Sequence, residues 1–238
     1  MRILRFFCET LNGDRAELDP VQSHHLGKVL RLGVGDSVQV FDGKGLVANA
    51  TIEQVGRDQV VLRIVDRTQL PPKASGRVIL AVSIAKGERF DWMIEKCTEL
   101  GADHIAAVQY ERTVKMGKES ALERYKKIAL SAAKQCGRLH LPTVSGPDTF
   151  KNTVFQLRTR YPQAVLVYGD AEGIALEPDS CVKELSDKII CIGPEGGFSE
   201  AELQFFADAN ARAVCINPNI LRIETAAVAF AAILCRTP

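Results

Sequence analysis

The stretch best suited to bind a ligand is a glycine-rich segment, IGPEGGFSEAEL, at residues 192–203. A short apolar run ends at Ile192, and three glycines and a proline follow it within five residues. Glycine permits backbone conformations and close approaches that a side chain would block. We therefore interpret the segment as a loop whose main chain faces a ligand, with an ordinary tight turn as the alternative. No Lys-Ser or Lys-Thr pair follows the glycines, so the segment does not match a triphosphate-binding loop.

A second candidate is NPNILRIETAAVAF at residues 217–230, which places one basic residue, Arg222, just before an alanine-rich helix. Arginine is permanently charged, so Arg222 would supply a fixed positive charge beside a ligand loop. Pairing of Arg222 with Glu224 or with a backbone carbonyl is the structural alternative, and the spacing does not choose between them.

A third candidate is the stretch 111–138, which carries eight basic and three acidic residues. Such a stretch is either a solvated helix face or a surface that binds the phosphates of a nucleic acid. In the second case the stretch supplies the candidate RNA-binding residues Arg112, Lys115 and Arg138. Basic residues elsewhere would extend the surface, namely Arg5, Lys28, Arg31, Lys86 and Arg89.

The net charge of the 238-residue chain is +1, yet its charge is unevenly distributed. Residues 1–72 are neutral, residues 73–160 carry sixteen basic and nine acidic side chains, and residues 161–238 carry five and eleven. A neutral chain with a basic middle remains compatible with a polyanionic partner. The apolar content of 46% is that of a soluble globular protein with a core.

Several classes of protein are disfavoured. The seven cysteines are scattered without a C-x-x-C pair, which favours reduced thiols in a cytoplasm over a disulfide framework or a zinc site. No His, Cys and Asp cluster has metal-ligand spacing, so we expect no metal. No apolar run is long enough to cross a bilayer and no secretory signal is evident, so we expect a cytoplasmic protein without a membrane partner.

The elements that must position these residues change character along the chain. Residues 1–72 predict a small β-rich domain with a helix at 21–32 and strands at 36–42, 46–55 and 59–65, ending in a proline-containing linker. Residues 73–238 predict strands alternating with helices, which is typical of a mostly parallel sheet covered on both faces. The expected strands are 78–84, 104–108, 164–168, 188–192 and 213–216, and the expected helices are 89–100, 119–136, one from about 200 with a capping box of Ser199 and Glu202, and 224–235. Ligands bind beyond the carboxyl ends of parallel strands, where both candidate loops fall.

These motifs together resemble the RsmE family of 16S ribosomal RNA uridine-N3 methyltransferases, members of the SPOUT superfamily. The resemblance is carried by RFF, HHLGKVLRLGVGDSVQVFDGKG, AKGERFDWMIEKCTELGAD, QCGRLHLP, IGPEGGFSEAEL and ILRIETAA. It implies a PUA-like RNA-binding β-barrel over residues 1–72. It also implies a SPOUT methyltransferase domain over residues 73–238 with a C-terminal trefoil knot, and a homodimer.

The resemblance further implies that S-adenosyl-L-methionine binds largely through backbone groups of three loops, and that 16S rRNA or the small ribosomal subunit is the partner. The implied cofactor-binding residues are Leu166, Gly169, Ile192, Gly193, Pro194, Gly196, Gly197, Ile216, Asn217, Ile220, Leu221, Thr225 and Ala226. Uracil N3 carries a proton, so we expect Arg222 to stabilise the developing uridinate charge and Glu195 to act as the base. A ribose 2′-O methyltransferase of the same superfamily and a non-catalytic RNA-binding protein are the alternatives.

Overall fold

The chain forms two compact units in a computed structural model that describes residues 4–56, 59–114, 120–176 and 186–235. The first unit comprises Met1–Pro72 together with Ala133–Leu141, and the second comprises Lys73–Ala132 and Pro142–Pro238. Residues 133–141, which we expected within the second domain, therefore group with the first unit. The backbone explains this grouping, since the Leu141 N–H donates to the Gly43 carbonyl at 2.9 Å.

The first unit is built on a five-stranded sheet in the order β1-β3-β4-β5-β2. Its strands are β1 (Arg5–Phe7), β2 (Arg15–Leu18), β3 (Ser37–Phe41), β4 (Leu46–Val55) and β5 (Val60–Gln69). The pairing of β1 with β3 is parallel, and the other pairings are antiparallel. Alternate residues of β3 and β4 face a core that includes Phe6, Leu26 and Val40.

The expected helix at 21–32 is shorter and less regular than its pattern predicts. It consists of α1 (Pro20–His24) followed by a π-helix, η1 (His25–Val29). Asp19 caps α1, because its carboxylate accepts the N–H of Gln22 at 2.7 Å. The expected strands appear as β3, β4 and β5, whereas β1 and β2 are too short to show a periodic pattern.

The second unit contains a six-stranded sheet in the order β11-β9-β10-β6-β7-β8, and every pairing in it is parallel. The strands are β6 (Val78–Ser83), β7 (His104–Gln109), β8 (Thr143–Thr149), β9 (Val165–Ala175), β10 (Lys188–Ile192) and β11 (Arg212–Cys215). Every residue of β6 and β10 is buried. This confirms that their continuous apolar runs belong to strands covered on both faces.

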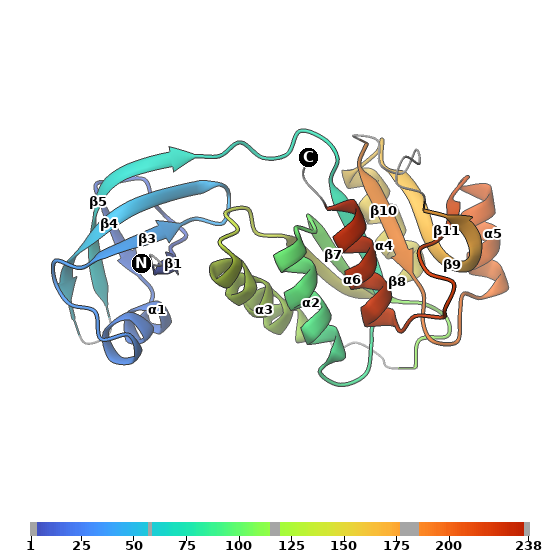
Figure 1. Cartoon of the computed structure of the whole chain (residues 1–238), viewed down its shortest axis with the longest axis horizontal. Helices are drawn as coiled ribbons and strands as arrows, with labels where there is room; N and C mark the ends of the chain where they lie inside the picture. The colour runs from blue at the N-terminus through green and yellow to red at the C-terminus, as the bar shows by residue number, and fades with distance from the viewer. Residues whose placement is uncertain (1–3, 57–58, 115–119, 177–185, 236–238) are drawn as a thin grey trace. The chain divides into compact units, whose positions relative to one another are not determined.

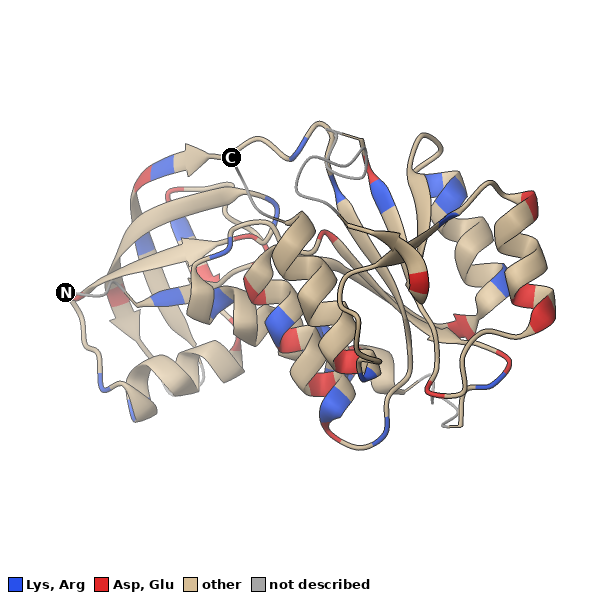
Figure 2. Ribbon diagram, turned by 45° about the vertical axis from the view of Figure 1, so that its right-hand side comes forward, with Lys and Arg blue, Asp and Glu red and all other residues tan. Residues whose placement is uncertain are grey.

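Helices cover both faces of this sheet (Figure 1). One face packs against α2 (Arg89–Leu100), the first part of α3 (Ala121–Cys136) and α6 (Ile223–Leu234). The other face packs against α4 (Phe150–Arg160) and α5 (Glu200–Asp208). Along the ribbons of this unit, basic and acidic residues are intermixed (Figure 2).

The sequence pattern predicts α2, α3, α5 and α6 but misses β8 and α4. The sequence of β8, TVSGPDT, contains Gly and Pro, which weaken a strand pattern. That of α4, FKNTVFQLRTR, contains two threonines and an asparagine, which are poor helix formers. β8 forms because it pairs with β7 and buries Val144, and α4 forms because Phe150 and Leu157 are buried against the sheet.

Candidate functional site

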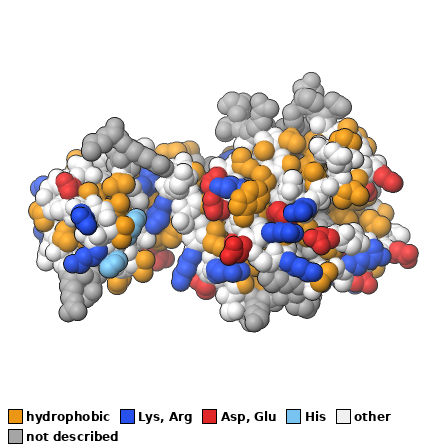
Figure 3. All heavy atoms as spheres, turned by 60° about the horizontal axis from the view of Figure 1, so that its bottom comes forward, with side chains coloured by type: hydrophobic (Ala, Val, Ile, Leu, Met, Phe, Trp, Pro, Cys, Tyr) orange, Lys and Arg blue, Asp and Glu red, His pale blue; other side chains and the backbone are white. Residues whose placement is uncertain are grey.

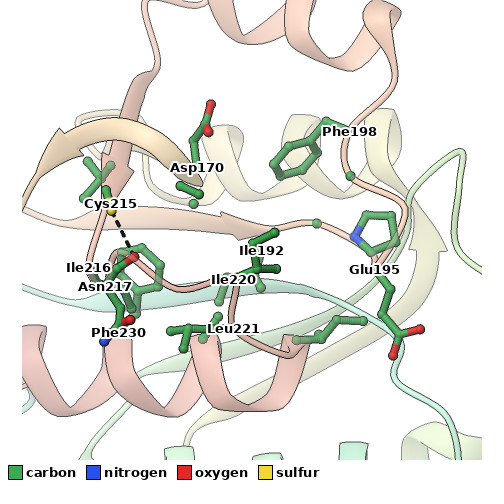
Figure 4. A pocket seen from close by; sticks show the side chains of 18 of the residues that line it. Asp170, Ile192, Glu195, Phe198, Cys215, Ile216, Asn217, Ile220, Leu221 and Phe230 are labelled. Carbon is green, nitrogen blue, oxygen red and sulfur yellow. Dashed lines mark hydrogen bonds between the residues drawn. The ribbon is translucent and has the colours of Figure 1, made fainter.

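A cavity of about 410 Å³ lies beyond the carboxyl ends of β9, β10 and β11, where ligands bind in parallel α/β sheets. Three segments line it: the distal part of β9, the loop after β10 and the segment that joins β11 to α6. The lining residues are Gly169, Asp170, Ala171, Ile192, Gly193, Pro194, Glu195, Gly197, Phe198, Leu203, Val214, Cys215, Ile216, Asn217, Asn219, Ile220, Leu221, Ile223, Ala226 and Phe230. Its walls are mostly apolar (Figure 4), as in typical small-molecule sites.

The cavity brings together most of the residues expected to bind a cofactor. Ten of them line it: Gly169, Ile192, Gly193, Pro194, Gly197, Ile216, Asn217, Ile220, Leu221 and Ala226. Three do not line it. Leu166 lies within β9 and is buried in the core on the α4 and α5 face, Gly196 is exposed in the loop, and Thr225 is exposed on α6.

The irregular course of β9 shapes the cavity wall in which the expected cofactor residue Gly169 lies, and the sequence does not reveal this irregularity. Tyr168 pairs with Ala213, but the next pair joins Ile174 to Val214, so residues 169–173 bulge out of the β9–β11 ladder. Asp170 and Ala171 reach the cavity because of this bulge. A strand predicted to end at residue 168 does not indicate it.

Further lining residues are missed because they look like ordinary core residues in the sequence. These are Phe198, Leu203, Val214, Cys215, Ile223 and Phe230. All of them except Val214 and Cys215 lie within the two candidate segments, 192–203 and 217–230, and that position is the signal that could have found them. Cys215 is fixed by a hydrogen bond from its Sγ to the Asn217 carbonyl at 3.1 Å (Figure 4).

The loop after β10 is shaped by two of its three glycines. A Cβ atom on Gly193 would lie 2.9 Å from the ring of Phe198, closer than Cβ contacts are observed. Gly197 has φ +73°, a left-handed conformation that favours glycine. Gly196 has no such constraint, since a Cβ atom there would meet Arg112 at an ordinary 3.5 Å.

The end of this loop is fixed by the capping box expected from the sequence. Ser199 Oγ accepts the N–H of Glu202 at 3.3 Å, and Glu202 Oε2 accepts the N–H of Ser199 at 2.9 Å. The other oxygen of this buried carboxylate accepts the N–H of Glu111 at 2.9 Å. The capping residue therefore also ties the loop after β10 to the loop after β7.

Charged residues are few in the cavity wall, which includes Asp170 and Glu195. Glu195 points away from Ile220 and Leu221 (Figure 4). Its Oε1 lies 3.9 Å from Nη1 of Arg89, whose Nε lies 3.8 Å from Oε1 of Glu224. Arg89, expected to bind RNA, thus lies between two carboxylates near the cavity.

Arg222 is exposed at the N-cap position of α6, and its carbonyl accepts the N–H of Ala226 at 2.8 Å. It is adjacent in sequence to Leu221 and Ile223, which line the cavity, but does not line it itself. Pairing with Glu224, the structural alternative, is not seen. Within the described residues, no contact of the Arg222 guanidinium is found, while Glu224 lies beside Arg89.

The remaining basic residues expected to bind RNA are dispersed. In the first unit, Arg5 donates to the Gly137 carbonyl at 2.6 Å, Arg138 donates to the His140 carbonyl, and Lys28 and Arg31 are exposed. In the second unit, Lys86 is exposed and Arg112 donates from Nη1 to the Gly196 carbonyl at 3.0 Å. Lys115 lies outside the described residues.

Part of the basic stretch is paired on helix faces. Lys126 contacts Glu123 at 2.8 Å and Arg124 contacts Asp91 at 3.2 Å. On the face drawn in Figure 3, basic side chains are interspersed with acidic and apolar ones. On that face the basic side chains do not form one continuous basic surface.

Within the ranges that the structure describes, no three His, Cys, Asp or Glu side chains are grouped so that they could hold a metal ion. None of the helices in those ranges has the length and hydropathy needed to span a bilayer.

Both units are similar to domains of known RNA methyltransferases. Residues 72–235 match the model of an RNA methyltransferase domain, and residues 18–65 match that of an RNA methyltransferase PUA domain. The ribosomal RNA small subunit methyltransferase E of Mycobacterium bovis is 32% identical, with 95% of this chain and 89% of that protein aligned. The Bacillus subtilis protein of the same name is 30% identical over 85% of this chain and 82% of its own length.

Two solved structures are similar over nearly the whole chain. The ribosomal RNA small subunit methyltransferase E of Neisseria gonorrhoeae, bound to S-adenosyl methionine, has a TM-score of 0.85 and 26% identity, covering 97% and 96% of the two chains. A Legionella pneumophila methyltransferase in complex with the same cofactor also has a TM-score of 0.85, with 28% identity over 98% and 97%. The matched domains and these relatives place the chain in the ribosomal RNA small subunit methyltransferase E family.

Proposed function

We propose that this protein transfers the methyl group of S-adenosyl-L-methionine to N3 of a uridine in 16S ribosomal RNA. The observation that carries the proposal is the cavity at the carboxyl ends of β9, β10 and β11, together with the relatives solved with this cofactor. The alternative, a non-catalytic RNA-binding protein that keeps a degenerate pocket, is disfavoured by the intact cavity loops at 193–197 and 221–226.

The cavity residues suit this cofactor. Ile192, Leu221 and Phe230 offer apolar walls for an adenine ring, and the backbone at Gly193 is free of a side chain. Asp170 offers a carboxylate for a hydroxyl or ammonium group. When bound, the cofactor supplies a methyl group already activated by its sulfonium, so the protein must chiefly align the two reactants.

The protein's chemical task is to make uracil N3 nucleophilic. The N3 proton must leave, and the electron pair that remains attacks the methyl carbon as the carbon–sulfur bond breaks. We assign charge stabilisation to Arg222, which lies in the chain between the cavity residues Leu221 and Ile223, and proton removal to Glu195 in the cavity wall. Since N3 is paired in a duplex, the target uridine must be unpaired or flipped out.

Substitution of each residue tests these roles. We expect Arg222→Ala to lower the single-turnover rate roughly 100-fold or more with little change in cofactor affinity. We expect Glu195→Gln to lower it roughly 100-fold, because the amide cannot accept the N3 proton. Full methylation by Arg222→Ala with normal cofactor binding would refute the assignment of charge stabilisation.

The function is tested by incubating the protein with 16S rRNA transcript or 30S subunits and labelled cofactor, followed by mass spectrometry of nucleosides. A methyl group on the uracil base supports the proposal, whereas one on the sugar supports the ribose 2′-O alternative. Absence of cofactor binding in a calorimetric titration would support the non-catalytic alternative.

Finer features of the fold and assembly belong to the same proposal. We propose a PUA-like barrel in the first unit that contacts RNA, a SPOUT-type trefoil knot near the C-terminus, and a cytoplasmic homodimer. The strand order β11-β9-β10 supports the knot, because the chain returns from β10 across β9 before it enters β11. Size-exclusion chromatography with light scattering tests the dimer.

A further inference from the structure

The loop after β7 is joined by one hydrogen bond to the loop after β10 and by a second to the first turn of α5, which follows that loop. Arg112 donates from Nη1 to the Gly196 carbonyl at 3.0 Å, and the backbone N–H of Glu111 donates to Oε1 of Glu202 at 2.9 Å. Gly196 does not line the cavity, but its neighbours Glu195 and Gly197 do. Arg112 therefore holds the cavity loop without occupying the cavity.

Among the residues that the structure describes, Arg112 makes one side-chain hydrogen bond, to Gly196. Arginine has five N–H donors, and the contact with Gly196 uses one of them. The residue is exposed, and it opens the basic stretch in which residues 73–160 carry a net charge of +7. A guanidinium can bind phosphate oxygens through two parallel hydrogen bonds, so a nucleic-acid backbone is the ligand that fits its free edge.

We propose that Arg112 is a positioning residue that bridges an RNA phosphate and the Gly196 carbonyl, so that RNA binding and cofactor binding strengthen each other. The inference rests on the proposed function. A phosphate on the free edge holds the guanidinium in place, and the guanidinium in turn holds the loop that carries Glu195 and Gly197. Coupling of this kind is reciprocal, so cofactor binding also strengthens RNA binding.

The coupling is measured as a thermodynamic cycle with the full-length protein. S-adenosylhomocysteine, which binds without transferring a methyl group, is titrated with and without saturating 16S rRNA transcript. We expect the transcript to tighten its binding to the unsubstituted protein roughly 5-fold or more. We expect Arg112→Ala to reduce that factor to about one. Arg112→Lys keeps the charge but lacks the planar fork, so it should retain more RNA affinity while still losing the coupling.

Lys127→Ala is the matched control, since it removes an equal charge from an exposed position of α3 in the same unit. This variant should keep the full coupling factor. The proposal is overturned if the unsubstituted protein shows no coupling, or if Arg112→Ala weakens S-adenosylhomocysteine binding equally with and without RNA, as a purely structural role would. Failure of the unsubstituted protein to bind S-adenosylhomocysteine at all would contradict the proposed function itself. Circular dichroism of each variant confirms that it folds.

Discussion

Substitution of the glycines after β10, one at a time by alanine, tests how the cavity loop is held. A Cβ atom on Gly193 would lie 2.9 Å from two ring atoms of Phe198 and 3.2 Å from a third. The ring cannot retreat freely, because its centroid lies 5.0 Å from that of Phe206, 5.4 Å from that of Tyr110 and 5.8 Å from that of Tyr168. Overpacking of this kind costs about 1–3 kcal/mol.

The cost should appear in one of two measurements, depending on where the strain is relieved. If the loop shifts, cofactor binding weakens by roughly 5- to 150-fold, since 1.4 kcal/mol corresponds to a factor of ten. If the loop stays in place, the melting temperature falls by about 2–4 °C for each kcal/mol. Calorimetric titration with S-adenosyl-L-methionine and thermal unfolding of the same preparations measure both effects.

The other two glycines provide internal comparisons. Gly196→Ala should change neither quantity appreciably, because its Cβ atom would meet Arg112 at 3.5 Å and its φ is not positive. Gly197→Ala should cost about 1–2 kcal/mol through its left-handed backbone, with no clash. Introducing Gly193→Ala into a Phe198→Leu background should remove much of the penalty. Equal effects of Gly193→Ala and Gly196→Ala would refute the packing argument.

Three further predictions concern other parts of the second unit. Burial, assisted by the charge of Arg160, lowers the pKa of His104 to about 4. Between about pH 6.5 and 4 only the unfolded chain binds this proton, so the free energy of unfolding should fall by about 3 kcal/mol as the pH falls through that window. Urea titrations should show that His104→Gln loses this part of the pH dependence. Arg89→Ala removes the partner of the buried Glu224, but Arg89 is itself exposed and lies 3.8 Å away, so the loss should be about 1 kcal/mol, measured by urea titration. An unchanged midpoint would show that the pair contributes nothing. S-adenosyl-L-methionine should protect Cys215 in the cavity wall from iodoacetamide, while the exposed Cys136 still reacts. Peptide mass spectrometry measures the labelling of each thiol, and equal protection of both would contradict the cavity assignment.

The sequence by itself determined the class of the fold. Continuous apolar runs at 78–84 and 188–192 predict strands buried on both faces, and alternation with amphipathic helices predicts a parallel sheet. The capping box of Ser199 and Glu202 was likewise predictable, since capping depends on residues three positions apart. Turn-forming residues and hydrophobic periodicity are local properties of the sequence, and they predicted the positions of the loops that line the cavity.

Only the tertiary structure decided which side chains meet. The bulge in β9 that brings Asp170 to the cavity depends on pairing with β11, more than forty residues later. Arg89 and Arg112 looked alike as basic residues, yet one lies between two carboxylates and the other holds the Gly196 carbonyl. Charge and spacing in sequence cannot assign such partners. Arg89 follows β6 and Arg112 follows β7, whereas their partners follow β10 or lie in α6, so the groups meet only when the sheet forms.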